Sequence, residues 1–224
     1  MRFALSSVTI LFHVEQMTPE AFESEFSVPG SPLDRGTIEA LGRYEALLID
    51  WQTRMNLVGP ATLSDIWFRH FADSAQLSRL VPKGKSWLDI GAGGGFPGLV
   101  LSTMGWGQFT LVDSIAKKCR FLEAVRDELK LDAKIVCARV ESLPTLGVEV
   151  ATARAAAPLV TLFDWAIRHL RPGGLCIFPK GRRWAEEVEE AKDKFSFDFE
   201  AHASMTDAGA HILVCTNLGR RRCA

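Results

Sequence analysis

Hydrophobic residues follow a helical spacing through the first third of the chain. In the stretch 33–56, apolar side chains fall near one helical face at Ile38, Leu41, Leu48 and Met55. A shorter helix is expected after Thr18, a good N-cap residue, and another over about 63–80. The sequence therefore predicts a helical N-terminal layer over 18–81.

The pattern changes after Val81-Pro82-Lys83-Gly84. From there, short apolar runs rich in β-forming residues alternate with helical stretches, and the runs cover 86–91, 108–113, 133–138, 148–153 and 174–180. Helices between them are expected to begin near Pro97, Ser114, Pro158 and Arg182. Because buried strands that alternate with helices are typical of parallel sheets covered on both faces, the pattern predicts an α/β fold.

The last two predicted strands, 195–203 and 210–217, differ from the others. Too few residues separate them for a crossover helix, so we expect an antiparallel hairpin. Five parallel strands followed by such a hairpin are uncommon among dinucleotide-binding proteins. This Rossmann-like, mostly parallel seven-stranded sheet is the usual pattern of class I S-adenosylmethionine-dependent methyltransferases, so the sequence predicts a methyltransferase domain over 82–224.

Composition limits the partners and the cellular compartment that can be expected for the protein. The net charge of −1 gives no global signal for nucleic acid, so such a partner would have to meet local basic patches. The five cysteines are scattered and lack CxxC spacing, which favours a reducing, cytoplasmic compartment and indicates neither disulfides nor a metal site.

The first seventeen residues carry a short apolar run behind one arginine, but no cleavage site for a signal peptidase follows. No run approaches the roughly 18 apolar residues of a membrane span. We expect 1–17 to be an arm without fixed structure, or translation to start at Met17 instead of Met1.

A glycine-rich loop follows the first parallel strand, at WLDIGAGGGFPGLVL (87–101). Gly91, Gly93 and Gly95 allow positive φ angles and a close approach of a ligand to the backbone. Gly93, Gly95 and Gly98 also satisfy GxGxxG, so a nicotinamide or flavin site is an alternative to a methyl donor.

The acidic residue Asp89 is expected to distinguish these ligands. A carboxylate close to the loop would repel a pyrophosphate, whereas the ammonium and sulfonium of S-adenosylmethionine would be attracted to it. The alternative is that Asp89 only accepts hydrogen bonds from loop amides. Asp113, which ends the second strand, is expected to accept ribose hydroxyls, or else to cap the following helix.

Several segments together resemble one family. WQTRMNLVGP (51–60), IWFRHFADS (66–74), LDIGAGGGFPG (88–98), LVDSIAKKCRFLEAV (111–125), ARVESL (138–143) and ATARAAAPL (151–159) are similar to the bacterial small-subunit rRNA guanine-N7 methyltransferases of the RsmG (GidB) type. The resemblance runs from about Leu41 to Gly181.

The resemblance implies a class I fold, S-adenosylmethionine as donor and 16S rRNA of the small ribosomal subunit as substrate, methylated in its decoding-region loop. Carried over by position, the cofactor-binding residues are Gly91, Phe96, Val140, Glu141 and Arg154. The family often has leucine where this chain has Phe96, and both side chains supply an apolar wall.

The expected chemistry needs no reacting side chain. No NPPY-like motif follows the fourth strand, as methylation of an exocyclic amine would favour, and no cysteine is placed as a nucleophile. Guanine N7 is a lone pair without a proton, so we expect no general base and no catalytic residue beyond those that position the reactants.

RNA contacts are expected at basic residues beside the carboxyl ends of strands. One cluster is Lys117, Lys118 and Arg120, and a second is Lys180, Arg182 and Arg183, with Lys180 the strongest candidate. Arg69 and His70 can add to this rim, His70 as a structural hydrogen-bond donor. Each cluster has the alternative of a solvated face.

The alternatives to an rRNA methyltransferase are a small-molecule methyltransferase, an NAD-dependent oxidoreductase and a nucleotide-binding module without catalysis. We expect a monomer, with no membrane or DNA partner.

Overall fold

The computed structural model describes residues 17–27 and 32–221. Its strands are β1 (Lys85–Ile90), β2 (Gly107–Asp113), β3 (Ala133–Cys137), β4 (Val148–Thr152), β5 (Leu170–Lys180), β6 (Phe195–Ala203) and β7 (His211–Arg220). Its α-helices are α1 (Pro19–Phe26), α2 (Arg35–Gln52), α3 (Asp73–Ala75), α4 (Gly98–Thr103), α5 (Ala116–Leu129), α6 (Leu159–Ala166) and α7 (Trp184–Lys192). Residues 1–16, to which most of the predicted arm belongs, 28–31 and 222–224 lie outside the described residues.

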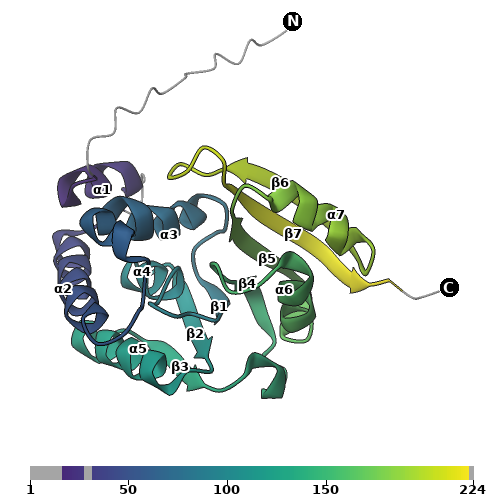
Figure 1. The fold of residues 1–224 in the computed structure, drawn as a ribbon, viewed down its shortest axis with the longest axis horizontal. Coiled ribbons are helices and arrows are strands. Elements are labelled where there is room, and N and C mark those ends of the chain that lie inside the picture. Colours follow the sequence, from purple (N-terminus) through teal and green to yellow (C-terminus); the bar gives the residue numbers. More distant parts are fainter. Residues whose placement is uncertain (1–16, 28–31, 222–224) are drawn as a thin grey trace, which may run out of the picture.

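The seven strands form one sheet in the order β3-β2-β1-β4-β5-β7-β6 (Figure 1). The first five are parallel, and β7 runs antiparallel to both β5 and β6, so the predicted parallel sheet with a terminal hairpin is confirmed. Strand β1 lies between β2 and β4, where the direction of winding reverses. In open α/β sheets, ligands bind outside the carboxyl ends of the strands at this point.

The prediction of one regular helix over 63–80 is wrong. The chain forms instead a 3-10 turn η1 (Pro60–Asp65), a π-helical turn η2 (Trp67–Ala72), the short α3 and a second 3-10 turn η3 (Gln76–Arg79). The wider π turn buries Trp67 and Phe71 against each other in the core, with ring centroids 5.1 Å apart, while Arg69 and His70 line a cleft. Such turns recur at functional sites, and hydrophobic spacing alone does not reveal them.

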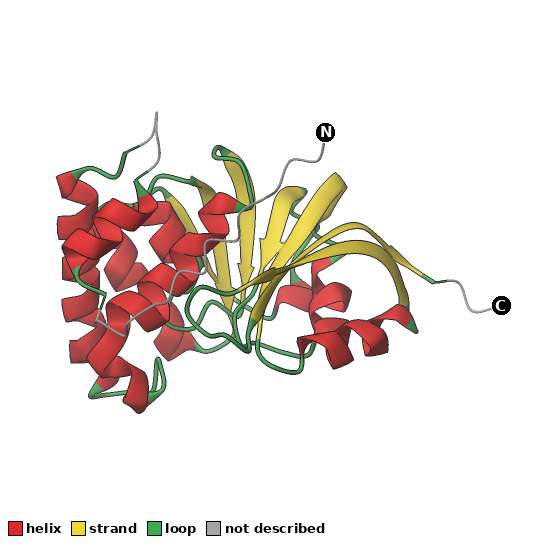
Figure 2. Ribbon diagram, turned by 90° about the horizontal axis from the view of Figure 1, so that it is seen from above, coloured by secondary structure: helices red, strands yellow, loops and turns green. Residues whose placement is uncertain are grey.

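Two hydrophobic clusters cover the two faces of the sheet, and Figure 2 shows the helices gathered on either side of the strands. The first cluster joins residues of the N-terminal helices, such as Tyr44 and Phe71, to Trp87 and Leu111 of the sheet. The second packs Phe163 of α6 beneath the opposite face. The N-terminal layer therefore shares its core with the strands that follow residue 82.

The turn between β6 and β7 is bonded to the N-terminal layer. The Thr206 hydroxyl donates to Asp73 Oδ1 over 2.6 Å, and Arg69 donates to the Thr206 carbonyl over 3.1 Å. The Met205 amide donates to the Gln76 side chain over 2.9 Å. These contacts, which we call the latch, join segments about 130 residues apart in sequence. Within the described ranges, no helix is long and apolar enough to cross a membrane.

Candidate active site

The glycine loop adopts the backbone conformation that its sequence predicts. Gly91, Gly93 and Gly95 have φ angles of 68°, 57° and 86°. The buried Tyr44 hydroxyl donates to the Gly94 carbonyl, and a side chain at Gly95 would collide with that hydroxyl. The helical layer thus fixes the loop from behind, because α2 supplies the tyrosine.

Asp89 lies beneath the loop instead of facing a ligand. Its side chain is fully buried and lines neither of the two cavities described below. Its Oδ2 accepts a hydrogen bond from the Gly98 amide over 2.8 Å, while its Oδ1 has no hydrogen-bond partner among the residues that the structure describes. Burial raises the pKa of Asp89 to about 7. The expectation of a ligand-facing carboxylate is corrected: Asp89 braces the start of α4, as the alternative interpretation had it.

Asp113 also braces the loop, but it remains open to a ligand. Its Oδ2 accepts from the Gly93 amide over 3.0 Å and its Oδ1 from the Ile115 amide over 2.8 Å. Each oxygen keeps a second lone pair, and the residue lines the smaller cavity. Helix α5 has no side-chain cap, so the role of helix cap foreseen as an alternative is not found.

Two cavities meet at the carboxyl ends of the parallel strands. The larger has a volume of about 1040 Å³ and is lined by Gly91, Gly93, Phe96 and Arg154 among others. The smaller, of about 310 Å³, is lined by Asp113, Val140 and Glu141, as well as by Gly91. All the predicted cofactor residues except Asp89 therefore line one or both cavities. Gly91, Lys118, Ala155 and Ala156 line both, which makes them the junction.

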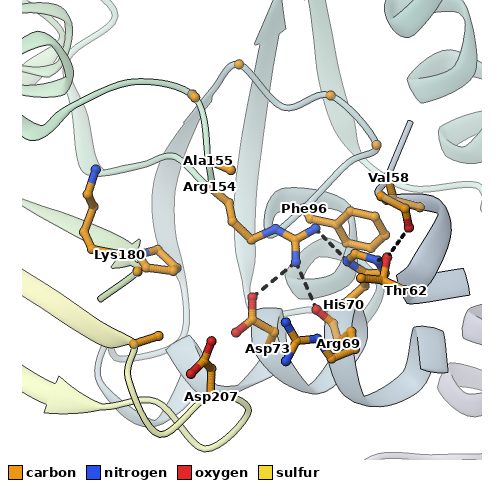
Figure 3. A pocket seen from close by; sticks show the side chains of 18 of the residues that line it. Val58, Thr62, Arg69, His70, Asp73, Phe96, Arg154, Ala155, Lys180 and Asp207 are labelled. Carbon is orange, nitrogen blue, oxygen red and sulfur yellow. Dashed lines mark hydrogen bonds and ion pairs between the residues drawn. The ribbon is translucent and has the colours of Figure 1, made fainter. Parts of the chain in front are cut away.

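Arg154 is held in the larger cavity by several partners, which Figure 3 shows. One guanidinium nitrogen lies 3.2 Å from Asp73 Oδ2 and donates to the Arg69 carbonyl, also over 3.2 Å. The guanidinium carbon lies 4.5 Å from the centre of the Phe96 ring, which is itself 97% buried by Tyr44, His70 and Phe71. Phe96 thus offers an aromatic face to the cation, while its role as an apolar wall for the cofactor stays a prediction.

His70 completes the surroundings of Arg154. Arg154 donates to His70 Nδ1 over 3.0 Å, and since arginine only donates, this nitrogen is unprotonated. The other nitrogen, Nε2, therefore carries the proton and donates to the Thr62 hydroxyl over 2.7 Å, which in turn donates to the Gly59 carbonyl. Burial and the nearby Arg154 and Arg69 lower the pKa of His70 to about 3. The predicted donor role is confirmed, and the acceptor role is added to it.

Residues 155–158, here called the strap, lead from Arg154 into α6 and lie over the glycine loop. Ala155 has a φ of 52°, and a Cβ built on Gly91 would lie 3.0 Å from the Ala156 Cβ. Lys180, the strongest RNA candidate, turns inward to this strap: its ammonium donates to the Ala157 carbonyl over 3.1 Å and lies 2.6 Å from Glu187 Oε2.

The other predicted RNA residues differ in their partners. Lys117 is exposed on the first turn of α5, and neither it nor Arg120 forms an ion pair with any residue that the structure describes. Arg69 is exposed at the cleft but donates to Thr206. Arg182 lies against the backbone at Gly209, and it lines neither cavity.

Some residues of the site were missed by sequence reasoning. Asp73 and Thr62 both belong to segments that resemble the family or adjoin them, but nothing in their spacing indicates that Asp73 meets Arg154, 81 positions away, or that Thr62 meets His70, which bonds Arg154. Lys118 was treated only as part of a basic cluster, whereas it lines both cavities. The available signal was its place in the first turn of α5, directly after the carboxyl end of β2. Among the described residues, no group of three or more His, Cys, Asp or Glu is placed to hold a metal ion.

Solved structures with similar folds agree with this architecture. A SAM-dependent methyltransferase from Aquifex aeolicus aligns with a TM-score of 0.53 and 14% identity, covering 77% of this chain and 97% of that chain. TYW2 of M. jannaschii, solved in complex with AdoMet, aligns with a TM-score of 0.55 and 11% identity over 75% of this chain and 80% of that one. At these identities the likeness shows the class I methyltransferase fold alone.

Sequence comparison identifies the family. Residues 37–215 match the profile of GidB, rRNA small subunit methyltransferase G. Curated relatives named ribosomal RNA small subunit methyltransferase G include one from Paramagnetospirillum magneticum, 41% identical over 86% of this chain and 94% of the relative. Another, from Caulobacter vibrioides, is 42% identical over 83% of this chain and 87% of the relative. The chain therefore belongs to the rRNA small subunit methyltransferase G family of S-adenosylmethionine-dependent methyltransferases.

Proposed function

We propose that this protein transfers the methyl group of S-adenosylmethionine to N7 of a guanosine in 16S rRNA, in the decoding-region loop of the small subunit. The observation that carries the proposal is the pair of cavities joined at Gly91 and the strap. The smaller cavity has a size suited to a nucleoside, and the larger exceeds what the rest of the donor needs. The remaining volume supports a site for the target base.

The residues of the two cavities fit this donor. S-adenosylmethionine supplies a methyl group on a positively charged sulfur. Asp113, Val140 and Glu141 line the smaller cavity. We assign Asp113 to the ribose hydroxyls, Val140 to the face of the adenine and the Glu141 backbone to its ring nitrogens. Gly91, at a φ of 68°, lets the donor pass from the smaller cavity to the larger one without a side chain in the way. Arg154 points into the larger cavity and has donors left for an anionic group of a ligand.

The proposed reaction requires positioning and no proton transfer. The lone pair of guanine N7 forms the new bond to the methyl carbon, and the bond to sulfur breaks with its electrons left on sulfur. Three titratable groups that line the larger cavity agree with this, since His70, Asp73 and Glu187 are each engaged in hydrogen bonds to protein. The protein holds the reactants in line and excludes water, which can lower the barrier by several kcal/mol.

The target base has to reach the cleft from outside its helix. The major groove of A-form RNA is too deep and narrow to be read there, so a loop base or a flipped base is required. Lys117, which has no ion-pair partner among the described residues, and Arg69 at the cleft rim are proposed to meet phosphates. A cytoplasmic monomer is consistent with a ribosomal substrate.

The test is to incubate the purified protein with labelled S-adenosylmethionine and small subunits assembled from unmodified 16S transcript. Methyl label at N7 of one guanosine, located by fragment mass spectrometry, is expected. Label on free nucleosides but not on subunits would favour a small-molecule enzyme. Calorimetry should show binding of S-adenosylhomocysteine and none of NADH, and the reverse result would favour the oxidoreductase.

A further inference from the structure

The strap is attached at its far end by a buried ion pair that neither the family likeness nor the proposed function assigns. Lys180 ends β5 and Glu187 lies on α7, and their side chains are only 9% and 18% exposed. The ammonium donates to the Ala157 carbonyl, and the same Glu187 oxygen that meets the ammonium also accepts from the Leu159 amide over 2.7 Å. One pair thus connects β5, the strap, the start of α6 and α7.

The near end of the strap is attached separately. Arg154, the residue before it, is bonded to Asp73 and His70 of the N-terminal layer. Between the two attachments, the Ala155 and Ala156 backbones form no hydrogen bond with any part of the chain that the structure describes. The conformation of the strap therefore depends on its ends, although Ala155 occupies a left-handed conformation unusual for a residue with a side chain.

The strap lies where a small displacement would matter most. Ala155 and Ala156 line both cavities, and Ala156 packs directly on Gly91. The donor methyl and the target atom must meet at this junction within about 3 Å and in line, and an error near 1 Å can cost about 100-fold in rate.

We propose that Lys180 and Glu187 are positioning residues, which hold the strap at the junction of the two cavities, and that Lys180 does not contact RNA phosphate. This inference rests on the proposed function for its kinetic test, but its structural test does not. The contacts of Lys180 support this: its side chain is only 9% exposed, and although it lines the larger cavity, its charge is paired with the Glu187 carboxylate and a second of its three donors is bonded to the Ala157 carbonyl.

The first experiment compares Lys180→Met with Lys192→Met. The control also breaks a lysine–glutamate pair that involves α7, since Lys192 lies 2.7 Å from Glu189, but both partners there are exposed and neither lines a cavity. We expect the single-turnover rate of methyl transfer to small subunits to fall about 10- to 100-fold in Lys180→Met. The slope of RNA affinity against salt concentration should stay unchanged. A slope reduced by about one, with the transfer rate intact at saturation, would instead indicate a phosphate contact and overturn the proposal.

The second experiment uses Glu187→Gln, for which the two roles predict opposite results. The amide oxygen can still accept from Leu159, so the fold should survive, but the charge that fixes Lys180 is lost. A positioning pair predicts slower transfer, whereas a phosphate-binding Lys180 would be released and would bind RNA more tightly. Tighter RNA binding with an undiminished transfer rate would therefore contradict the proposal.

Hydrogen exchange of the strap gives a readout that needs no RNA. We expect amides in the peptide 154–162 to exchange faster in Glu187→Gln and Lys180→Met than in wild type, and Lys192→Met to match wild type. Unchanged exchange in both variants would refute the proposal that the Lys180–Glu187 pair holds the strap. If the wild-type protein methylates no rRNA but exchange of the strap is still faster in the two variants, the proposed substrate is wrong and the role of the Lys180–Glu187 pair in holding the strap is kept.

Discussion

Arg154 donates a hydrogen bond to His70, and the histidine can accept it only while neutral. Burial and the two nearby guanidinium groups, Arg154 and Arg69, lower the pKa of His70 to about 3, so the accepting form persists across the physiological range. The proton on the other ring nitrogen is directed to Thr62. Neutral His70 therefore holds the Arg154 guanidinium in the cleft by accepting a hydrogen bond, without the repulsion that a charged imidazolium would cause.

His70→Asn should retain most of the methyltransferase activity, while His70→Ala should lose about 10-fold or more. The asparagine oxygen can take the place of Nδ1 as acceptor for Arg154, and alanine offers none. The measurement is the transfer rate at saturating donor and substrate, with thermal melting to confirm folding. Equal loss in both variants, with equal melting temperatures, would show that the ring itself and not its acceptor nitrogen is required.

Asp89 predicts a pH dependence of stability. Its folded pKa is raised from the ordinary value of 3.8 to about 7, so between these values the folded protein binds a proton that the unfolded chain does not. The free energy of unfolding should therefore fall as pH rises from about 4 to 7. Asp89→Asn cannot ionise and should lack this loss.

Thermal melts of wild type and Asp89→Asn at pH 5 and pH 8 measure this difference. The melting temperature of the variant relative to wild type should be higher at pH 8 than at pH 5. The increase should be about 2–4 °C for each kcal/mol of unfolding free energy that ionisation of Asp89 costs the wild type. A difference that does not vary with pH would mean that Asp89 is ionised throughout this range. Stabilisation of wild type by S-adenosylmethionine beyond that of the variant would show that the buried carboxylate still attracts the donor.

Gly91→Val should abolish cofactor binding. A side chain here would meet Ala156 at 3.0 Å and fill the junction of the cavities, at a φ of 68° that a β-branched residue rarely adopts. Gly147→Val is the matched control, because its φ is 67° and a side chain would meet nothing within 4 Å. Calorimetry with S-adenosylhomocysteine should find binding only in the control, and loss in both would trace the effect to backbone strain.

Lys117→Gln combined with Arg120→Gln should weaken RNA binding and reduce its salt slope by about two. Both residues are exposed on the first half of α5, and neither has an ion-pair partner within the described part of the chain. Arg171→Gln is the control, since Arg171 is exposed near the start of β5, at the opposite end of the strand from Lys180, and pairs with Glu149. Filter binding at several salt concentrations gives the slopes, and an equal effect of the control would indicate only a change in net charge.

The sheet could be predicted from the sequence because its signals are local. Apolar runs, glycines and the short connection before β7 each depend on neighbouring residues, and the structure confirms them. The family resemblance then supplied Gly91, Val140 and Arg154, which line the cavities.

The partners of charged residues could not be predicted in this way. Lys180 and Lys117 look alike in sequence, since each follows a strand in a basic cluster. Their difference comes from α7, whose Glu187 pairs with Lys180, whereas no carboxylate of the described residues pairs with Lys117. Likewise, the direction of the Asp89 side chain depends on where α4 begins, and the π turn at Trp67–Ala72 depends on packing of its aromatic residues.

The latch between Thr206 and Asp73 has a consequence for how the protein is made. Synthesis delivers the N-terminal helices first, and Thr206, the partner of Asp73 and Arg69, is added more than 130 residues later. Until that turn has been synthesised, Asp73, which pairs with Arg154 in the cleft, lacks its hydrogen bond from Thr206. The finished cleft therefore forms only once the β6–β7 hairpin has been synthesised, well behind the helical layer that it completes.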